Sequence, residues 1–318
     1  MTGSALLFAQ RLKSHVEQSV FGVESIVDAL TVAIIAQGHV LLQGVPGIGK
    51  TLLAKTVAVT LGGTFKRIQC TADLMPSDMT GVHVFNTATS KFEFIPGPLF
   101  ADVVLVDEIN RTSPKTQSAL LQAMEENAVT IDRNTYELAR NFFVIAAQNP
   151  REFEGTYPLP ESQVDRFLIR VDMDYPSPQG EETVLRRYDK PGGGHQGKTP
   201  SEPSAVTPEL LAAAREHARS VTVSDALYQY VCLIAQASRR LPQIQLGLST
   251  RGALALMRCA RVKAALRDAQ YVTPDDVMAV APLVIKHRLL LNTEATLEGL
   301  DSDTMLAQIL ASVDVPRV

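Results

Sequence analysis

A glycine-rich segment at residues 44–51 (GVPGIGKT) lies between an apolar run and a helical one. Glycines in such a turn let successive backbone N–H groups face a phosphate at a helix N-terminus, where the helix dipole favours an anion. Lys50 would then bridge the β- and γ-phosphates of a nucleoside triphosphate, and the Thr51 hydroxyl would ligate Mg²⁺. We therefore predict ATP and Mg²⁺ as ligands; the plain alternative is a strand-closing turn with a solvated lysine. The residues expected around the phosphates are Gly44, Val45, Pro46, Gly47, Ile48, Gly49, Lys50, Thr51 and Leu52.

An acid pair, Asp107 and Glu108, follows the apolar run at residues 103–106. In a parallel α/β sheet the carboxyl ends of the strands are where ligands collect. Asp107 is expected to hold Mg²⁺ through water, and Glu108 to orient and deprotonate the water that attacks the γ-phosphate. The alternative is that both acids are ordinary solvated residues at a strand end.

Three further polar residues sit where they could serve the same reaction. Asn149 ends the apolar run FFVIAAQN, Arg166 precedes the last apolar run, and Arg251 opens a helix. Taken alone, the Asn149-Pro150 pair indicates a turn, and each arginine indicates a surface charge.

The elements that must position these residues fall into two parts. Up to Pro176, short β-type runs alternate with helical patterns, which favours an α/β fold with a parallel sheet covered on both faces. The runs lie at residues 39–43, 64–69, 103–106, 142–147 and 168–172. We predict an α/β nucleotide-binding domain at residues 1–176 and an all-helical domain at residues 177–318.

The second part opens with a Pro-, Gly- and Ser-rich stretch at residues 191–208, which indicates a loop or linker. Helix starts follow at Thr207-Pro208 and Ser224-Asp225, and a helix is expected from Thr250 onward. Thr273-Pro274 followed by two acids is the strongest helix start, because it combines an N-cap, proline at the first helical position and acids in the first turn.

Two stretches interrupt the alternation, at residues 81–95 and 128–138. Each has β-rich arms around a polar turn and is predicted to be an inserted β-hairpin. We expect Phe85, Phe92 and Phe94 of the first hairpin to form a small core rather than a binding surface.

Composition narrows the class of protein. Among 318 residues, 46% are hydrophobic and 20% charged, as in a globular protein with a substantial core. The net charge of −4 argues against binding to nucleic acid by phosphate neutralisation. No apolar run approaches the ~20 residues of a membrane span, and the first residues lack the pattern of a secretory signal. Cys70, Cys232 and Cys259 are odd in number and irregularly spaced, so we expect reduced core cysteines in a cytoplasmic protein.

The order of these features resembles that of the AAA+ ATPases, and the local sequence is similar to the MoxR branch. The resemblance extends over residues 21–261 and is carried by GVPGIGKT, GPLFADVVLVDEINRTSPKTQSALLQAMEE, AAQNPREFEGTYPLPESQVDRFLIR and, more loosely, GLSTRGALAL. It implies the fold of that family, a five-stranded parallel sheet domain with hairpin inserts and a C-terminal helical lid.

The resemblance also implies roles. Asn149 matches the sensor 1 position, which orients the attacking water, and Arg166 matches the arginine finger that reaches the γ-phosphate of a neighbouring subunit. Arg251 matches sensor 2, although the family's usual G-A-S-P-R-A segment is replaced here by GLSTRG. The stretch expected around the adenine comprises Phe21, Gly22 and Val23. Rivals for the interface arginine are Arg111, Arg151 and Arg170.

At the level of function, the resemblance implies an ATP-hydrolysing chaperone that forms a ring, with a hexamer as the expected number. It implies client proteins as partners, including proteins with von Willebrand factor A domains. The alternatives are a nucleic-acid motor or helicase loader of a related AAA+ clade, and a nucleotide-gated interaction module without catalysis. Neither hairpin tip carries a cluster of basic residues, which disfavours nucleic acid as the partner.

Overall fold

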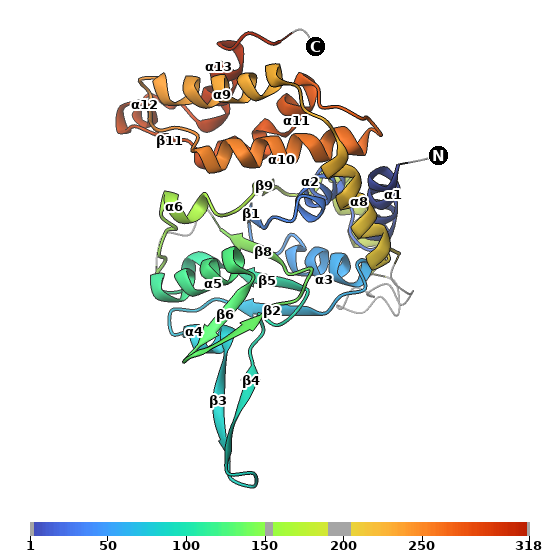
Figure 1. The fold of residues 1–318 in the computed structure, drawn as a ribbon, viewed down its shortest axis with the longest axis vertical. Helices are drawn as coiled ribbons and strands as arrows, with labels where there is room; N and C mark the ends of the chain where they lie inside the picture. Colours follow the sequence, from blue (N-terminus) through green and yellow to red (C-terminus); the bar gives the residue numbers. More distant parts are fainter. Residues whose placement is uncertain (1–2, 150–154, 190–204, 317–318) are drawn as a thin grey trace.

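The computed structural model describes residues 3–149, 155–189 and 205–316 (Figure 1). Its centre is a parallel five-stranded sheet with the strand order β2-β5-β8-β1-β9. The strands are β2 (Phe65–Gln69), β5 (Val103–Asp107), β8 (Phe143–Gln148), β1 (Val40–Gly44) and β9 (Ile169–Met173). The predicted sheet is confirmed.

The central strands are apolar along their whole length because both faces of the sheet are covered. In β5 every residue is buried, and alternate side chains enter different cores. Val103 and Leu105 pack on the side of α3 (Lys50–Thr60), whereas Val104 and Val106 pack on the side of α5 (Pro114–Glu126). Helices α1 (Ser4–Glu17) and α2 (Glu24–Ile35) extend the first of these cores.

Both predicted hairpins are present as antiparallel pairs. The first joins β3 (Gly81–Asn86) to β4 (Lys91–Pro96), after the short helix α4 (Pro76–Thr80), and extends from the end of the molecule opposite the lid (Figure 1). The second joins β6 (Ala128–Ile131) to β7 (Asn134–Glu137).

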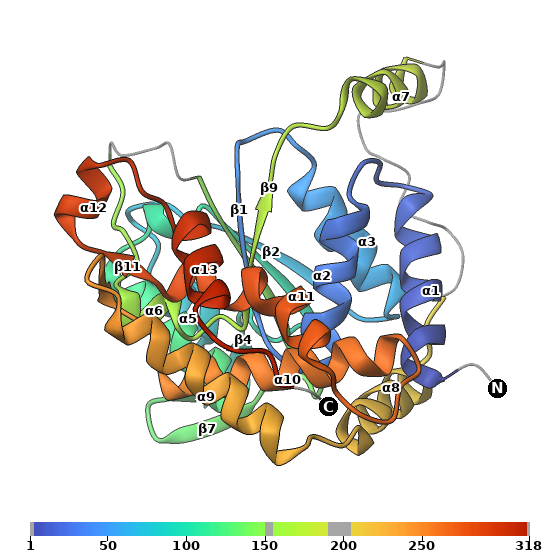
Figure 2. The ribbon, with the colours of Figure 1, turned by 90° about the horizontal axis from the view of Figure 1, so that it is seen from above.

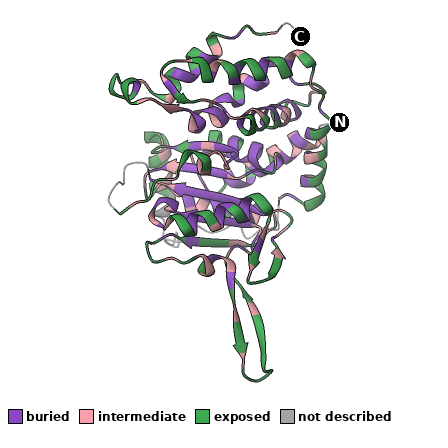
Figure 3. Ribbon diagram, turned by 60° about the vertical axis from the view of Figure 1, so that its left-hand side comes forward, coloured by how far each residue is buried: buried purple, intermediate pink, exposed green. Residues whose placement is uncertain are grey.

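Of the three phenylalanines expected to form a small core in the first hairpin, only one is packed against another element. Phe94 stacks on Tyr136 of the second hairpin, with ring centroids 4.2 Å apart. Phe85 and Phe92 contact each other but are 49% and 70% exposed. Figure 3 shows that most of this projecting hairpin is exposed. The expectation was wrong for these two residues because, among the described residues, the outer part of the hairpin is left largely exposed.

Helices dominate the chain after β9, as predicted. They are α7 (Pro178–Tyr188), α8 (Pro208–Ser220), α9 (Asp225–Arg240), α10 (Thr250–Leu266), α11 (Pro274–Ile285), α12 (Thr293–Leu297) and α13 (Ser302–Ala311). The lid also contains a two-stranded pair, β10 (Ile244–Leu246) with β11 (Leu290–Leu291), which the helical patterns did not indicate. The short elements η1 (Ile109–Arg111), α6 (Glu161–Val164) and η2 (Lys286–Arg288) complete the described fold.

The proposed division at residue 176 stays a prediction. Helix α8, which follows the predicted loop at 191–208, packs against both α1 and α10 and so contacts both parts of the chain. Residues 190–204 of that loop lie outside the described residues.

Cys70 and Cys259 are buried as expected, whereas Cys232 is exposed; all three are free. Among the described residues, no helix combines the length and apolar character that crossing a membrane requires.

The start of α11 allows a test of lid stability. Asp276 is buried and accepts hydrogen bonds from the backbone N–H and hydroxyl of Thr273 and from Arg267, with oxygen–nitrogen distances near 2.8 Å. Burial acts to raise the pKa of Asp276, but these hydrogen bonds together lower it, so the carboxylate is charged at neutral pH. Asp276→Asn should therefore reduce the free energy of unfolding by roughly 2 kcal/mol.

Urea unfolding followed by circular dichroism measures this change. The matched control is Asp275→Asn, which removes the same charge from an exposed position in the same helical turn. Equal stability losses in the two variants would contradict a specific role for Asp276.

Candidate nucleotide site

The glycine-rich segment connects β1 to α3, at the carboxyl end of the sheet. Gly47 and Gly49 have φ angles of 84° and 89°, a backbone region that favours glycine. At Gly44 a Cβ atom would lie 2.4 Å from the carbonyl oxygen of Met173 on β9, so only glycine fits. The sequence therefore produces the tight turn that a phosphate cradle requires.

Lys50 is the first residue of α3 and is buried, with 8% of its surface exposed. Its Nζ donates a hydrogen bond to the carbonyl oxygen of Gly44, at 2.9 Å. This places an ammonium group inside the turn, beside the N-terminus of α3, where positive charge and helix dipole both favour an anion. Thr51 follows in the first turn of the same helix.

A cavity of about 540 Å³ adjoins this turn. Six of the predicted residues line it, namely Phe21, Pro46, Gly47, Ile48, Gly49 and Leu52. Its mainly apolar lining is of the kind that holds a planar base. Val23, by contrast, is 3% exposed and belongs to the core, and Gly22 forms a turn with φ of 69°.

The residues of the opposite wall of this cavity were not predicted from the sequence. It consists of residues that follow β9, namely Tyr175, Pro176, Glu181, Val184 and Leu185. Helix α7, which carries the last three, lies on the side of the sheet where β1 and β9 end (Figure 2). A Tyr-Pro pair one residue after the last strand was the available signal.

The acid pair lies at the end of β5, next to β2. Asp107 is 9% exposed and accepts a hydrogen bond from Arg67 Nη2 at 2.7 Å. Glu108 has a left-handed backbone, with φ of 55°, and accepts a hydrogen bond from Gln69 Nε2 at 2.9 Å. Arg111 Nε also lies 3.2 Å from the Glu108 carboxylate. Two side chains of β2 and one of η1 thus surround the acids.

Arg67 and Gln69 are not among the residues predicted from the sequence. They alternate along β2, so both side chains lie on one face, and Arg67 also donates to Gln69 at 2.6 Å. A charged and an amide residue in alternate positions of a strand next to the acids was the only local signal. Because β2 and β8 flank β5 on opposite sides, Glu108 is turned toward β2 and away from the phosphate-loop side of the sheet.

The pKa of the Cys70 thiol reflects both burial and the negative charge of this region. Burial, followed by the nearby carboxylates of Asp107 and Glu108, raises the pKa of its thiol to about 12. The thiol therefore stays protonated at neutral pH, and it is not a nucleophile here.

Asn149 directly follows β8, the strand that lies between β1 and β5. It is 8% exposed. The central position of β8 brings Asn149 to the same edge of the sheet as Lys50 and the acid pair.

Oxygen ligands such as the Thr51 hydroxyl and the Asp107 carboxylate are what Mg²⁺ prefers, with phosphate and water completing its shell. Among the described residues there is no cluster of three or more His, Cys, Asp or Glu side chains suited to a metal.

Arg166 and Arg251 lie elsewhere. Arg166 precedes β9, Arg251 is in the first turn of α10, and each forms an ion pair with Glu125 near the end of α5, at 3.4 and 3.2 Å. The adjacent Met124 carbonyl oxygen lies 3.1 Å from Nε2 of His39, at the start of β1. Both arginines are therefore at the amino ends of the strands, separated from the phosphate loop by the length of β1, ~16 Å.

The rival arginines have different surroundings. Arg111 lies beside Glu108, and Arg170 pairs with Asp172 on its own strand at 3.1 Å. Arg151 lies outside the described residues.

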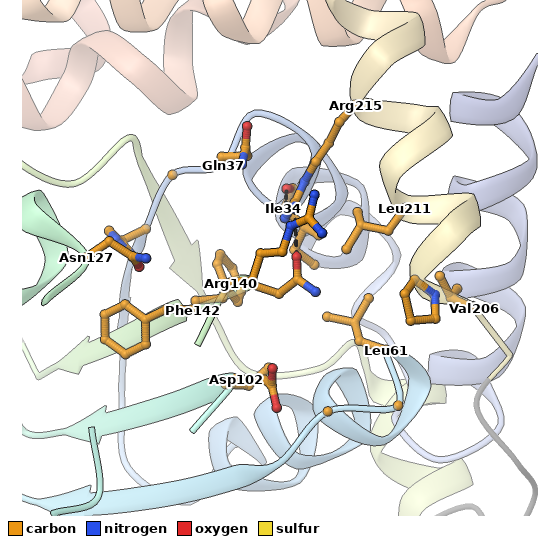
Figure 4. Close-up of a pocket in the computed structure, with 18 of the residues that line it drawn as sticks. Ile34, Gln37, Leu61, Asp102, Asn127, Arg140, Phe142, Val206, Leu211 and Arg215 are labelled. Carbon is orange, nitrogen blue, oxygen red and sulfur yellow. Dashed lines mark hydrogen bonds between the residues drawn. The ribbon is translucent and has the colours of Figure 1, made fainter. Parts of the chain in front are cut away.

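A second cavity, of about 420 Å³, opens at the amino ends of the strands (Figure 4). Arg215 of α8 lies in its wall, donating to Asn141 Oδ1 at 2.7 Å and to the Ile34 carbonyl oxygen at 3.3 Å. Burial, with repulsion from Arg219 and Arg140, lowers the pKa of Arg215 to about 10, so it remains charged. The cavity lies at the far end of the sheet from the glycine-rich turn and is not the nucleotide site.

Comparison with known proteins agrees with this geometry. Residues 39–169 match the family described as "ATPase family associated with various cellular activities (AAA)", and residues 236–309 match the AAA lid domain. The chain is 46% identical over 302 residues to the uncharacterized protein YeaC of Bacillus subtilis, spanning 95% of this chain and 93% of that protein. It is 37% identical over 320 residues to Chaperone MoxR1 of Mycobacterium tuberculosis, spanning 97% and 82%.

A solved structure shows the same fold. A Cytophaga hutchinsonii protein whose ATPase activity is inferred superposes with a TM-score of 0.89 at 36% identity, covering 99% of this chain and 97% of that one. The phosphate loop, the acid pair, the helical lid and these relatives lead to one conclusion: the chain belongs to the MoxR family of AAA+ ATPases.

Proposed function

We propose that this chain hydrolyses ATP to ADP and phosphate in the presence of Mg²⁺. The observation that carries the proposal is the convergence of Lys50, Asp107, Glu108 and Asn149 at the carboxyl ends of three adjacent strands. Lys50 would hold the terminal phosphates, Thr51 and Asp107 would hold Mg²⁺, and Asn149 would orient water. Mg²⁺, when bound, neutralises charge on the phosphate oxygens.

Glu108 would be the general base. Its present contacts hold it toward β2, so it must rotate away from Gln69 to reach water near the γ-phosphate. Exposed hydrogen bonds of this kind contribute about 1 kcal/mol, a barrier that binding events can overcome. We propose that Gln69 keeps basal hydrolysis low.

The position of Arg166 and Arg251 favours catalysis between subunits. Both side chains are partly exposed, at 31% and 45%, on the opposite side of the sheet from their own phosphate loop. In a head-to-tail assembly this side of one copy meets the nucleotide of the next, and such a heterologous contact closes into a ring. We propose a ring, with six subunits as the expected number, in which both arginines stabilise charge on a neighbour's γ-phosphate.

Chaperone activity is the proposed use of the hydrolysis cycle. The relative named Chaperone MoxR1 supports it, as does the apolar hairpin surface formed by Phe85 and Phe92, since exposed apolar patches mark protein contacts. Proteins with von Willebrand factor A domains are the proposed clients. The turns of both hairpins lack basic clusters, so no structural observation favours a nucleic-acid motor.

The first prediction about hydrolysis concerns the proposed base. Glu108→Gln should lower kcat roughly 100-fold or more while ATP still binds, because the amide cannot take a proton from water. Phosphate release and nucleotide retention on the purified protein measure the two effects. Glu161→Gln, on α6 and exposed, is the control. Unchanged hydrolysis in Glu108→Gln would exclude this residue as the base, and a non-hydrolysing wild type would exclude catalysis.

The second prediction concerns assembly. Specific activity should rise with protein concentration, and added Arg166→Ala subunits should inhibit wild-type protein, because each removes a cation from a neighbour's site. Titration of the variant into wild type at constant total protein measures this. The control is Arg240→Ala, at the exposed end of α9. This variant should contribute its own activity to the mixture and should not inhibit the wild-type protein. Activity that simply averages the two proteins would mean that each subunit works alone.

The third prediction concerns Gln69. Gln69→Ala should raise basal kcat about fivefold, the population change that corresponds to losing a hydrogen bond of about 1 kcal/mol. Steady-state phosphate release without client measures it. The neighbouring strand residue Lys66, exposed and also on β2, provides the control Lys66→Ala. A lower kcat in Gln69→Ala would show that the Gln69 contact is productive instead.

A further inference from the structure

We infer that Glu125 is a positioning residue that joins Arg166 and Arg251 into one binding site for the terminal phosphate of a second copy's nucleotide. This inference rests on the proposed function between subunits. It concerns a residue at the end of α5 that touches no part of its own chain's phosphate loop, and it explains why two arginines from different parts of the chain lie together.

The contacts are divided between the two carboxylate oxygens. Oε1 of Glu125 lies 3.2 Å from Arg251 Nη1, and Oε2 lies 3.4 Å from Arg166 Nη1. Two guanidinium groups this close would repel each other, and a shared carboxylate removes that repulsion. The three side chains are 31–45% exposed, so an external phosphate can reach them. Two positive charges and one negative leave a net positive site.

A second carboxylate fixes the backbones from which the two arginines extend. Asp165 directly precedes Arg166, and its Oδ2 accepts a hydrogen bond from the Ser249 hydroxyl at 2.9 Å. Ser249 is the N-cap of α10 and accepts from the Gly252 N–H at 3.0 Å. One carboxylate thus ties the start of α10, which carries Arg251, to the turn that carries Arg166.

Arg288 completes this backbone tie from the lid. Its Nε donates to Asp165 Oδ1 at 2.6 Å, and other nitrogens donate to the carbonyl oxygens of Phe167 and Leu168. The Arg288 side chain is 3% exposed, so its charge depends on these partners. The lid and the sheet are therefore held in fixed relation where the two arginines extend, and the described residue that forms ion pairs with both arginine side chains is Glu125.

Glu125→Gln should lower kcat about tenfold with KM for ATP within about twofold, because the nucleotide is held by a different subunit's phosphate loop and only the transition-state contacts are misplaced. Glu126→Gln is the matched control: it removes the same charge from the next residue, which bonds to Gln122 and to neither arginine. Light scattering and thermal unfolding should show unchanged assembly and folding for both variants.

The decisive experiment mixes subunits. Lys50→Ala subunits keep the arginines but lack a working phosphate loop, and Arg166→Ala subunits have the reverse defect, so a mixture should recover activity at mixed interfaces. Glu125→Gln placed in the Lys50→Ala subunit should reduce that recovered activity about tenfold. Placed in the Arg166→Ala subunit, it should leave the activity unchanged.

Each outcome has one meaning. No recovery in the parent mixture would refute catalysis between subunits, and the inference about Glu125 would fall with it. Recovery that is insensitive to Glu125→Gln in either subunit, or equally reduced by both placements, would overturn the role of Glu125 while leaving the proposed function intact. A loss confined to the arginine-donating subunit supports the positioning role.

Discussion

The parallel direction of five strands is the constraint on which the rest of this molecule depends. Because the strands run the same way, the turns that follow them lie at one edge of the sheet, formed by the carboxyl ends of the strands. Every strand start lies at the opposite edge, formed by the amino ends. Lys50, Asp107 and Asn149 meet at the first edge although they are far apart in sequence. Arg166 lies at the second edge for the same reason, since it precedes β9 instead of following a strand. A reaction that needs residues from both edges therefore needs two copies of the chain.

Neighbouring strands also decide how the acids are held. β2 is the edge strand beside β5, and the register pairs Gln69 with Asp107. This register allows Arg67 to neutralise Asp107 and allows Gln69 to reach Glu108 in the following turn. The Glu108 carboxylate is consequently held on the side of β5 away from β8 and β1. Strand order, and not the chemistry of the acid alone, sets its resting position.

Local sequence patterns were sufficient for the central sheet and for the glycine-rich turn, but not for the β10–β11 pair. The apolar run that becomes β5 and the glycines of residues 44–51 act through neighbours in the chain, so their structure follows from short-range rules. The ion pairs of Glu125 join residues about 40 and 125 positions apart, and no periodicity encodes such contacts. The cavity wall formed by Tyr175 and α7 was not predicted for a similar reason, because it depends on the path of the chain after β9. The exposed pair Phe85 and Phe92 was misplaced because a β-spaced aromatic pattern does not reveal whether another element covers it.

The buried contact between Arg288 and Asp165 changes how the lid can respond to nucleotide. A lid that senses its own nucleotide through Arg251 would have to bring that residue across the length of β1, and this would break the tie between Ser249, Asp165 and Arg288. Leaving a buried arginine without its carboxylate costs several kcal/mol, so such a movement is disfavoured. Helix α7 instead lines the cavity beside the glycine-rich turn, and the Arg251 side chain is 45% exposed. Nucleotide state would then reach each lid from two directions, its own site through α7 and a neighbour's site through Arg251, which makes the interface between copies part of the sensing machinery.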